Sequence, residues 1–174
     1  MGTEPPPEVR VAFAGVDAIM HAGDVYIQSC IDWLEQIAPV YAAPTGFRAG
    51  ASEASPRTSA PLVVELEGHK IGVVHKLSMM PLTEEVYPGA IEKWYPKNMS
   101  IRAELQDIFE QPVDIVVFGY THEAMIETHE GVLFVNSGSP NMVKQVMRVG
   151  TVAILDLTPT SAEARIIDLK TITA

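Results

Sequence analysis

The chain has 174 residues, 47% of them hydrophobic, which suits a single domain over 1–174 with a sizeable core. No apolar run approaches the roughly 20 residues of a membrane helix, and the prolines at 5–7 do not resemble a signal peptide, so we expect no membrane span. The formal net charge of −10 disfavours nucleic acid binding, because such a surface repels phosphate backbones. Cys30, the single cysteine, is compatible with a reducing cytoplasm, the location that we expect.

The first half of the chain predicts alternating helices and strands. Pro7 and Glu8 suit the first turn of a helix, and Gly15 suits its end. The apolar pattern then predicts a strand over Val16–Met20, a helix over Val25–Ile37 and a strand over Val40–Ala43. A loop over 44–60 and a hairpin of Leu62–Leu66 with Lys70–His75 around Gly68 follow.

Strands dominate the second half. Prolines make residues 76–96 irregular, and Ser100 can cap a helix over Ser100–Phe109. Apolar strands are expected at Asp114–Gly119 and Val132–Val135, followed by a meander of Thr151–Leu157 and Ala164–Leu169. Early alternation with later strands indicates an α/β layered fold with mixed sheets.

Three predicted strands end in groups that can bind metals or protons. His21 and Asp24 follow the first of these strands, His75 the second and His122 the third. Groups just past the carboxyl ends of strands converge in α/β sheets, so these side chains are candidate metal ligands or general bases. The alternative is that each histidine is a structural residue whose hydrogen bonds are made locally at the end of its strand.

Four short blocks occur in an order that resembles the calcineurin-like metallophosphoesterases, over about 8–169. The closest resemblance is to the small subgroup of prokaryotic phosphodiesterases and the retromer subunit of the same fold. The blocks are His21–Asp24, Ile71–His75, Gly119–His122 and Asn136–Ser139.

This resemblance implies a four-layer sandwich, in which two packed mixed β-sheets are flanked by helices and the usual first strand is lacking. It also implies hydrolysis of a phosphoester by metal-activated water, with a divalent metal of the Mn, Zn, Fe or Ni type. Position by position, Asp24 matches the carboxylate that bridges two metals, His75 a lone histidine ligand, and His122 the second histidine of the last block. These three are the predicted catalytic and metal-binding residues, whereas His21 is not a family ligand.

The sequence departs from the family pattern at several ligand positions. The first Asp-x-His block is missing, Gly46 and Arg48 stand where an asparagine and an acid are expected, and Tyr120 replaces the first histidine of the last block. Two ligands per ion is fewer than the three typical of catalytic zinc, so we expect an impaired site at reduced metal occupancy. The alternatives are a non-catalytic scaffold or binding protein and a plain structural domain.

Positive charge and a sheet edge complete the expectations. Lys76 and Arg48 either supply charge in place of a metal or lie on solvated loops. Without the family's first strand, the strand near Val16–Met20 would expose its edge, and such edges recruit strands from other chains. The expected partners are therefore a small phosphoester substrate and further copies of the chain in a homo-oligomer.

Overall fold

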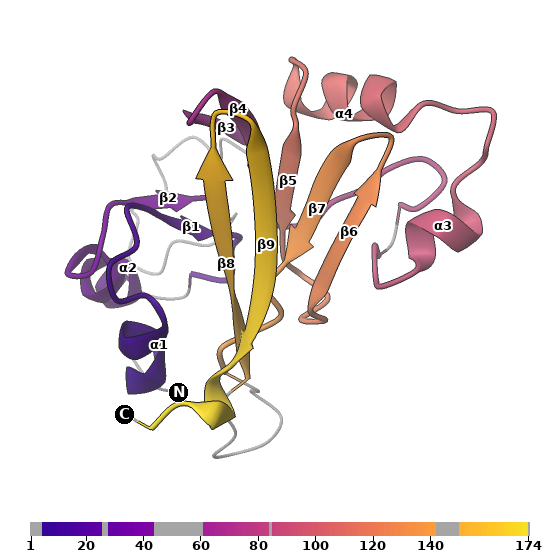
Figure 1. Ribbon diagram of the computed structural model, residues 1–174. Coiled ribbons are helices and arrows are strands. Elements are labelled where there is room, and N and C mark those ends of the chain that lie inside the picture. The colour runs from indigo at the N-terminus through magenta and orange to yellow at the C-terminus, as the bar shows by residue number, and fades with distance from the viewer. Residues whose placement is uncertain (1–4, 26–27, 44–60, 84, 142–149, 174) are drawn as a thin grey trace, which may run out of the picture.

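Helices and strands stack in four layers, helix, sheet, sheet and helix, in the computed structural model (Figure 1). The structure describes residues 5–25, 28–43, 61–83, 85–141 and 150–173. None of the helices within these ranges is both long and apolar enough to cross a membrane.

The first two layers come from the two ends of the chain. Helices α1 (Pro7–Ala12) and α2 (Gln28–Glu35) lie beside the parallel strands β1 (Ile19–His21) and β2 (Val40–Ala42). The antiparallel hairpin β8 (Thr151–Thr158) and β9 (Ser161–Asp168) and the short 3-10 helix η1 (Leu169–Thr171) complete them. A shared apolar core joins these elements; its buried members are Val9, Ile19, Trp33, Leu34, Ala38, Val152 and Leu169.

The third layer is a five-stranded mixed sheet in the order β3-β4-β5-β7-β6. Its strands are β3 (Leu62–Leu66), β4 (His69–Val74), β5 (Ile115–Phe118), β6 (Met125–His129) and β7 (Val132–Asn136). Strands β4, β5 and β7 run parallel, while β3 and β6 are antiparallel edges. The carboxyl ends of the three parallel strands therefore meet at one edge, where loops can build a site.

Alternate residues of the central strands fill two different cores, as the period of a strand requires. Ile71, Val73 and Ile115 face the layer of β8 and β9. Val116, Phe118 and Phe134 face the fourth layer, α3 (Ala90–Trp94) and α4 (Ile101–Phe109). Burial of each such side chain stabilises the fold by about 1.5–3 kcal/mol.

The sequence expectations for the fold are largely confirmed. The α/β class, the mixed sheet with flanking helices, the Gly68 hairpin and the Ser100 cap are all present, and the Ser100 hydroxyl accepts from Ala103 N. The strand expected at Val16–Met20 is displaced to Ile19–His21, because a turn with Gly15 at φ +81° precedes it. The helix expected to reach Ile37 ends at Glu35.

Three of the described elements were not predicted: helix α3, strand β6 and the short helix η1. Helix α3 lies in the segment expected to be irregular, and β6 carries polar residues that hid its strand character. Pairing with β7 through the Glu130–Gly131 turn makes β6 a strand despite them. The predicted loop at 44–60 lies outside the described residues.

Candidate active site

Asp24 lies in the loop that follows β1, and this loop packs tightly against His75. Both Gly23 (φ +108°) and Asp24 (φ +59°) have left-handed backbone conformations. A Cβ atom at Gly23 would lie 2.2 Å from His75 Nδ1, so a residue with a side chain would collide with the ring. The glycine of this block therefore permits the close approach of β1 and β4 at the site.

His75 follows β4 and is oriented by a hydrogen bond to the main chain. Its Nδ1 lies 2.8 Å from the carbonyl oxygen of Ala22, and because a carbonyl only accepts, Nδ1 carries the proton. In a neutral ring, Nε2 then presents a lone pair towards Asp24 Oδ1 at 3.5 Å. Metal-binding histidines are commonly oriented in this way by a bond from the other ring nitrogen. A proton or a cation between Nε2 and the carboxylate would stabilise the arrangement.

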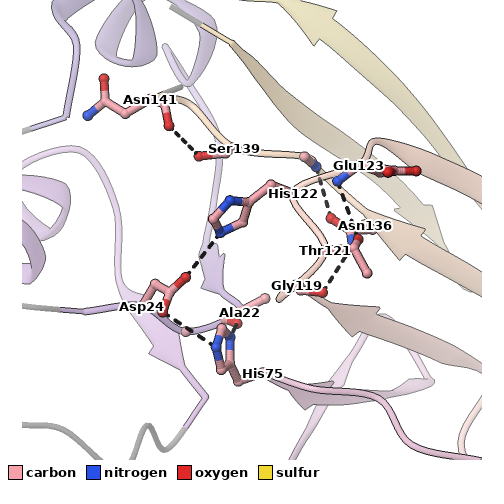
Figure 2. Close-up of polar contacts among 12 residues, drawn as sticks. Ala22, Asp24, His75, Gly119, Thr121, His122, Glu123, Asn136, Ser139 and Asn141 are labelled. Carbon is pink, nitrogen blue, oxygen red and sulfur yellow. Dashed lines mark hydrogen bonds and ion pairs between the residues drawn. The ribbon is translucent and has the colours of Figure 1, made fainter. Parts of the chain in front are cut away.

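His122 reaches the same carboxylate from the loop after β5. Its Nε2 lies 3.1 Å from Asp24 Oδ2, so each carboxylate oxygen faces one imidazole, as Figure 2 shows. The side chains of Asp24, His75 and His122 are 38%, 25% and 48% exposed, so small molecules in solvent can reach them. The three predicted site residues therefore lie together at the carboxyl ends of β1, β4 and β5.

Backbone strain marks these loops. Asp24, Tyr120 and His122 are non-glycine residues with positive φ, a conformation that costs about 1–3 kcal/mol each. The other such residues among those described lie at hairpin turns or a helix end; they are Glu67, Glu110 and Glu130. Strain away from ordinary turns and caps points to a functional role for this group.

Asn136, which is fully buried, holds the His122 loop in place. Its amide donates to Gly119 O at 3.1 Å and to Thr121 Oγ1 at 3.0 Å, and its Oδ1 accepts from Gly138 N (Figure 2). The sequence placed Asn136 in a family block without assigning it a role. A polar side chain at the end of an apolar strand is the sequence feature that predicts such a role, because a buried amide needs hydrogen-bond partners.

His21, the last residue of β1, supports the loop that carries Asp24. Its Nδ1 accepts from Gly23 N at 3.2 Å and so stabilises the turn that leads to Asp24. Burial lowers the pKa of His21 although the Asp24 charge opposes this shift, so the ring favours its neutral form. A neutral ring keeps Nδ1 available as an acceptor, which fits a structural role.

A cation and an aromatic ring lie beside His75. The Tyr120 ring meets the His75 ring edge to face, with centroids 5.7 Å apart. Lys76 Nζ lies 4.9 Å from the centroid of Tyr120, within reach of a cation–π interaction. Lys76 is thus near the candidate site, whereas Gly46 and Arg48 lie outside the described residues.

By donor type, although not by their present arrangement, Asp24, His75 and His122 suit one divalent cation better than two. A carboxylate and two imidazoles match the preferences of zinc, iron, nickel or manganese, and His75 already has the supporting hydrogen bond of a metal ligand. Within the described ranges, no group of three or more His, Cys, Asp or Glu side chains is arranged to hold a metal ion. A cation bound by these three side chains would have to take the place of the direct contacts between the Asp24 oxygens and the two imidazole nitrogens.

Sequence comparison places the chain in a family. Residues 3–160 match the calcineurin-like phosphoesterase superfamily domain, so the chain belongs to that superfamily. The protein named "Probable metallophosphoesterase" of Methanothermobacter thermautotrophicus is 27% identical over 144 residues, which cover 80% of this chain and 70% of that protein.

Solved structures show the same fold at low identity. Zinc-complexed Vps29 of Entamoeba histolytica aligns with a TM-score of 0.61 and 17% identity, covering 95% of this chain and 90% of that chain. A structure described as a novel archaeal phosphodiesterase aligns with a TM-score of 0.55 and 18% identity, covering 92% of each chain. Membership of this superfamily supports a phosphoesterase function, and the family generally depends on divalent metals.

Proposed function

We propose that this chain is a metal-dependent phosphoesterase of the phosphodiesterase type, with a reduced metal site formed by Asp24, His75 and His122. The observation that carries the proposal is the Asp24 carboxylate, whose two oxygens each face an imidazole Nε2 from a different strand end. The bond from His75 Nδ1 to Ala22 O supports it, because it turns the Nε2 lone pair towards that carboxylate.

The three residues act together in the proposed chemistry. Asp24, His75 and His122 would hold a divalent cation of the Mn, Zn, Fe or Ni type. When bound, such an ion polarises a phosphoryl oxygen and lowers the pKa of water. His122 is the most exposed of the three ligands, so its side of the site is the one that a substrate in solvent would approach.

A small phosphoester is the substrate class that we propose. The formal charge of −10 opposes the approach of long polyanions, whereas a small ester brings few charges. Because these residues give only two ligands to each of two ions, a tight dinuclear centre is not expected; we propose one weakly held ion, at reduced occupancy and with slow turnover. The cytoplasm remains the proposed location.

A matched pair of variants tests the proposal. Mn²⁺ binding is followed by electron paramagnetic resonance, and hydrolysis of bis(p-nitrophenyl) phosphate by absorbance, in the wild type, Asp24→Asn and Asp107→Asn. Asp107 lies on α4, whose buried face packs in a different core from the β1 loop, so its variant is the control. We expect Asp24→Asn alone to lose binding and to slow hydrolysis by about 10²–10³-fold. Equal activity in both variants would refute the proposed site.

Non-catalytic binding is the second candidate, and Tyr120 favours it. Tyr120 is 43% exposed, and its ring lies beside His75 at a position where the family resemblance implies a metal ligand. Exposed aromatic residues are common anchors in protein interfaces. Folded protein that neither binds Mn²⁺ nor hydrolyses the ester would favour this candidate.

We also propose self-association through the second layer. In the described residues, β1–β2 and β8–β9 are separate two-stranded sheets, although Ile19 and Val152 share one core. Each pair therefore has sheet edges that could accept a further strand, such as one from another copy of the chain.

A further inference from the structure

Lys76 is the cation closest in sequence to the candidate ligands, and its ammonium group lies over a ring that contacts one of them. It follows His75 directly, and its Nζ lies over the ring of Tyr120, which in turn contacts the His75 ring. The three side chains thus form a continuous series that begins with an ammonium group and leads to the imidazole facing Asp24.

The Tyr120 ring is held at this place by the loop rather than by burial. The residue is 43% exposed and has φ +72°, a strained conformation. Its neighbours fix it: Gly119 O accepts from the Asn136 amide, and a Cβ at Gly119 would lie 2.9 Å from Ala22 O. A ring fixed beside the site provides a platform for the ammonium group of Lys76.

We propose that Lys76 and Tyr120 form a phosphate subsite beside Asp24, His75 and His122, which binds a phosphoryl oxygen without a metal. The inference rests on the proposed function, because it assigns the anion-binding part of the same site. An ammonium group binds phosphate as a point charge, and a phenol can donate a hydrogen bond to the same oxygen or its neighbour. The fixed positive charge offsets the repulsion between the Asp24 carboxylate and an incoming anion.

Inorganic phosphate tests this subsite separately from metal chemistry. Its binding is measured by phosphorus NMR titration in the presence of EDTA, for the wild type, Lys76→Met, Lys76→Arg and Lys97→Met. Lys97 is an exposed lysine in the turn before α4 and serves as the matched control. We expect Lys76→Met to weaken binding about tenfold, the effect of losing one charge-assisted hydrogen bond, with recovery in Lys76→Arg and no change in Lys97→Met.

Two results would overturn the inference. One is equal weakening in Lys76→Met and Lys97→Met, which shows general charge attraction only. The other is phosphate binding that requires Mn²⁺, which leaves the proposed metal site intact and removes the subsite. Conversely, EDTA-resistant binding that depends on Lys76, in protein that binds no Mn²⁺, would support the subsite while refuting the metal-dependent function.

Discussion

Substitution of Gly23 by alanine tests how closely the loop after β1 packs on His75. The added Cβ would lie 2.2 Å from His75 Nδ1 and 2.4 Å from its Cγ, both well inside contact distance. The ring must therefore move, and its bond to Ala22 O is lost. Gly68→Ala is the matched control, because Gly68 also has positive φ, at +81°, but has no atom within 4 Å of the added Cβ.

The control separates backbone strain from the collision. Both variants force alanine into a left-handed conformation, which costs about 1–2 kcal/mol. Gly23→Ala adds overpacking of about 1–3 kcal/mol and a lost hydrogen bond of about 0.5–1.5 kcal/mol. We therefore expect Gly23→Ala to lower the free energy of unfolding by about 2–4 kcal/mol more than Gly68→Ala does.

Urea unfolding followed by circular dichroism measures this difference, and nitrogen-15 NMR of the imidazoles reports whether His75 Nδ1 loses its hydrogen bond. If the protein binds Mn²⁺, the displaced ring should also weaken binding by about 10–100-fold, as is typical when the support of a ligand is removed. Equal unfolding midpoints for the two variants, with an unchanged His75 signal, would refute the close packing and its role in orienting the ligand.

Three further predictions concern stability and assembly. The Glu130 carboxylate caps α4 by accepting hydrogen bonds from Ile101 N and Arg102 N. Glu130→Ala should therefore lower the free energy of unfolding by about 1 kcal/mol more than Glu67→Ala does. Glu67 is the control because it lies in the β3–β4 turn with nearly the same positive φ. The hydrogen bonds from the main chain, first that from Ile101 N, lower the pKa of Glu130 below 4.5. The stability that the Glu130 carboxylate contributes is therefore present above pH 4.5 and is lost as the pH falls through the lowered pKa. The difference between the urea unfolding midpoints at pH 7 and pH 3 should be smaller in Glu130→Ala than in the wild type. Asn136→Leu removes the partner of Gly119 O and Gly138 N and should cost about 1–3 kcal/mol by thermal unfolding; a loss under about 0.5 kcal/mol would show that water replaces the amide. Light scattering should report a dimer or larger assembly, and a stable, well-folded monomer would contradict self-association.

The sequence alone predicted four of the five strands of the central sheet, all but β6, and the residues that follow β4 and β5 at its edge. Apolar runs of strand length end just before His75 and His122, and parallel strands bring such ends to one side of a sheet. The same reasoning placed Asp24 after the first predicted strand, and the order of the four blocks added the family. These features are local or follow from chain order, so a single sequence carries them.

The tertiary structure decided how those residues meet. Ala22 and His75 are 53 positions apart in the chain, and Asp24 and His122 are 98 positions apart, yet hydrogen bonds join each pair. Such distant contacts also place one imidazole at each oxygen of the Asp24 carboxylate, pack Gly23 against His75 and let Asn136 support the His122 loop. Helix α3 and strand β6 likewise form against partners rather than from their own patterns. Tertiary packing overrides the local preference of a segment for helix or strand. Hydrogen bonds between distant strand ends form only after the layers have assembled.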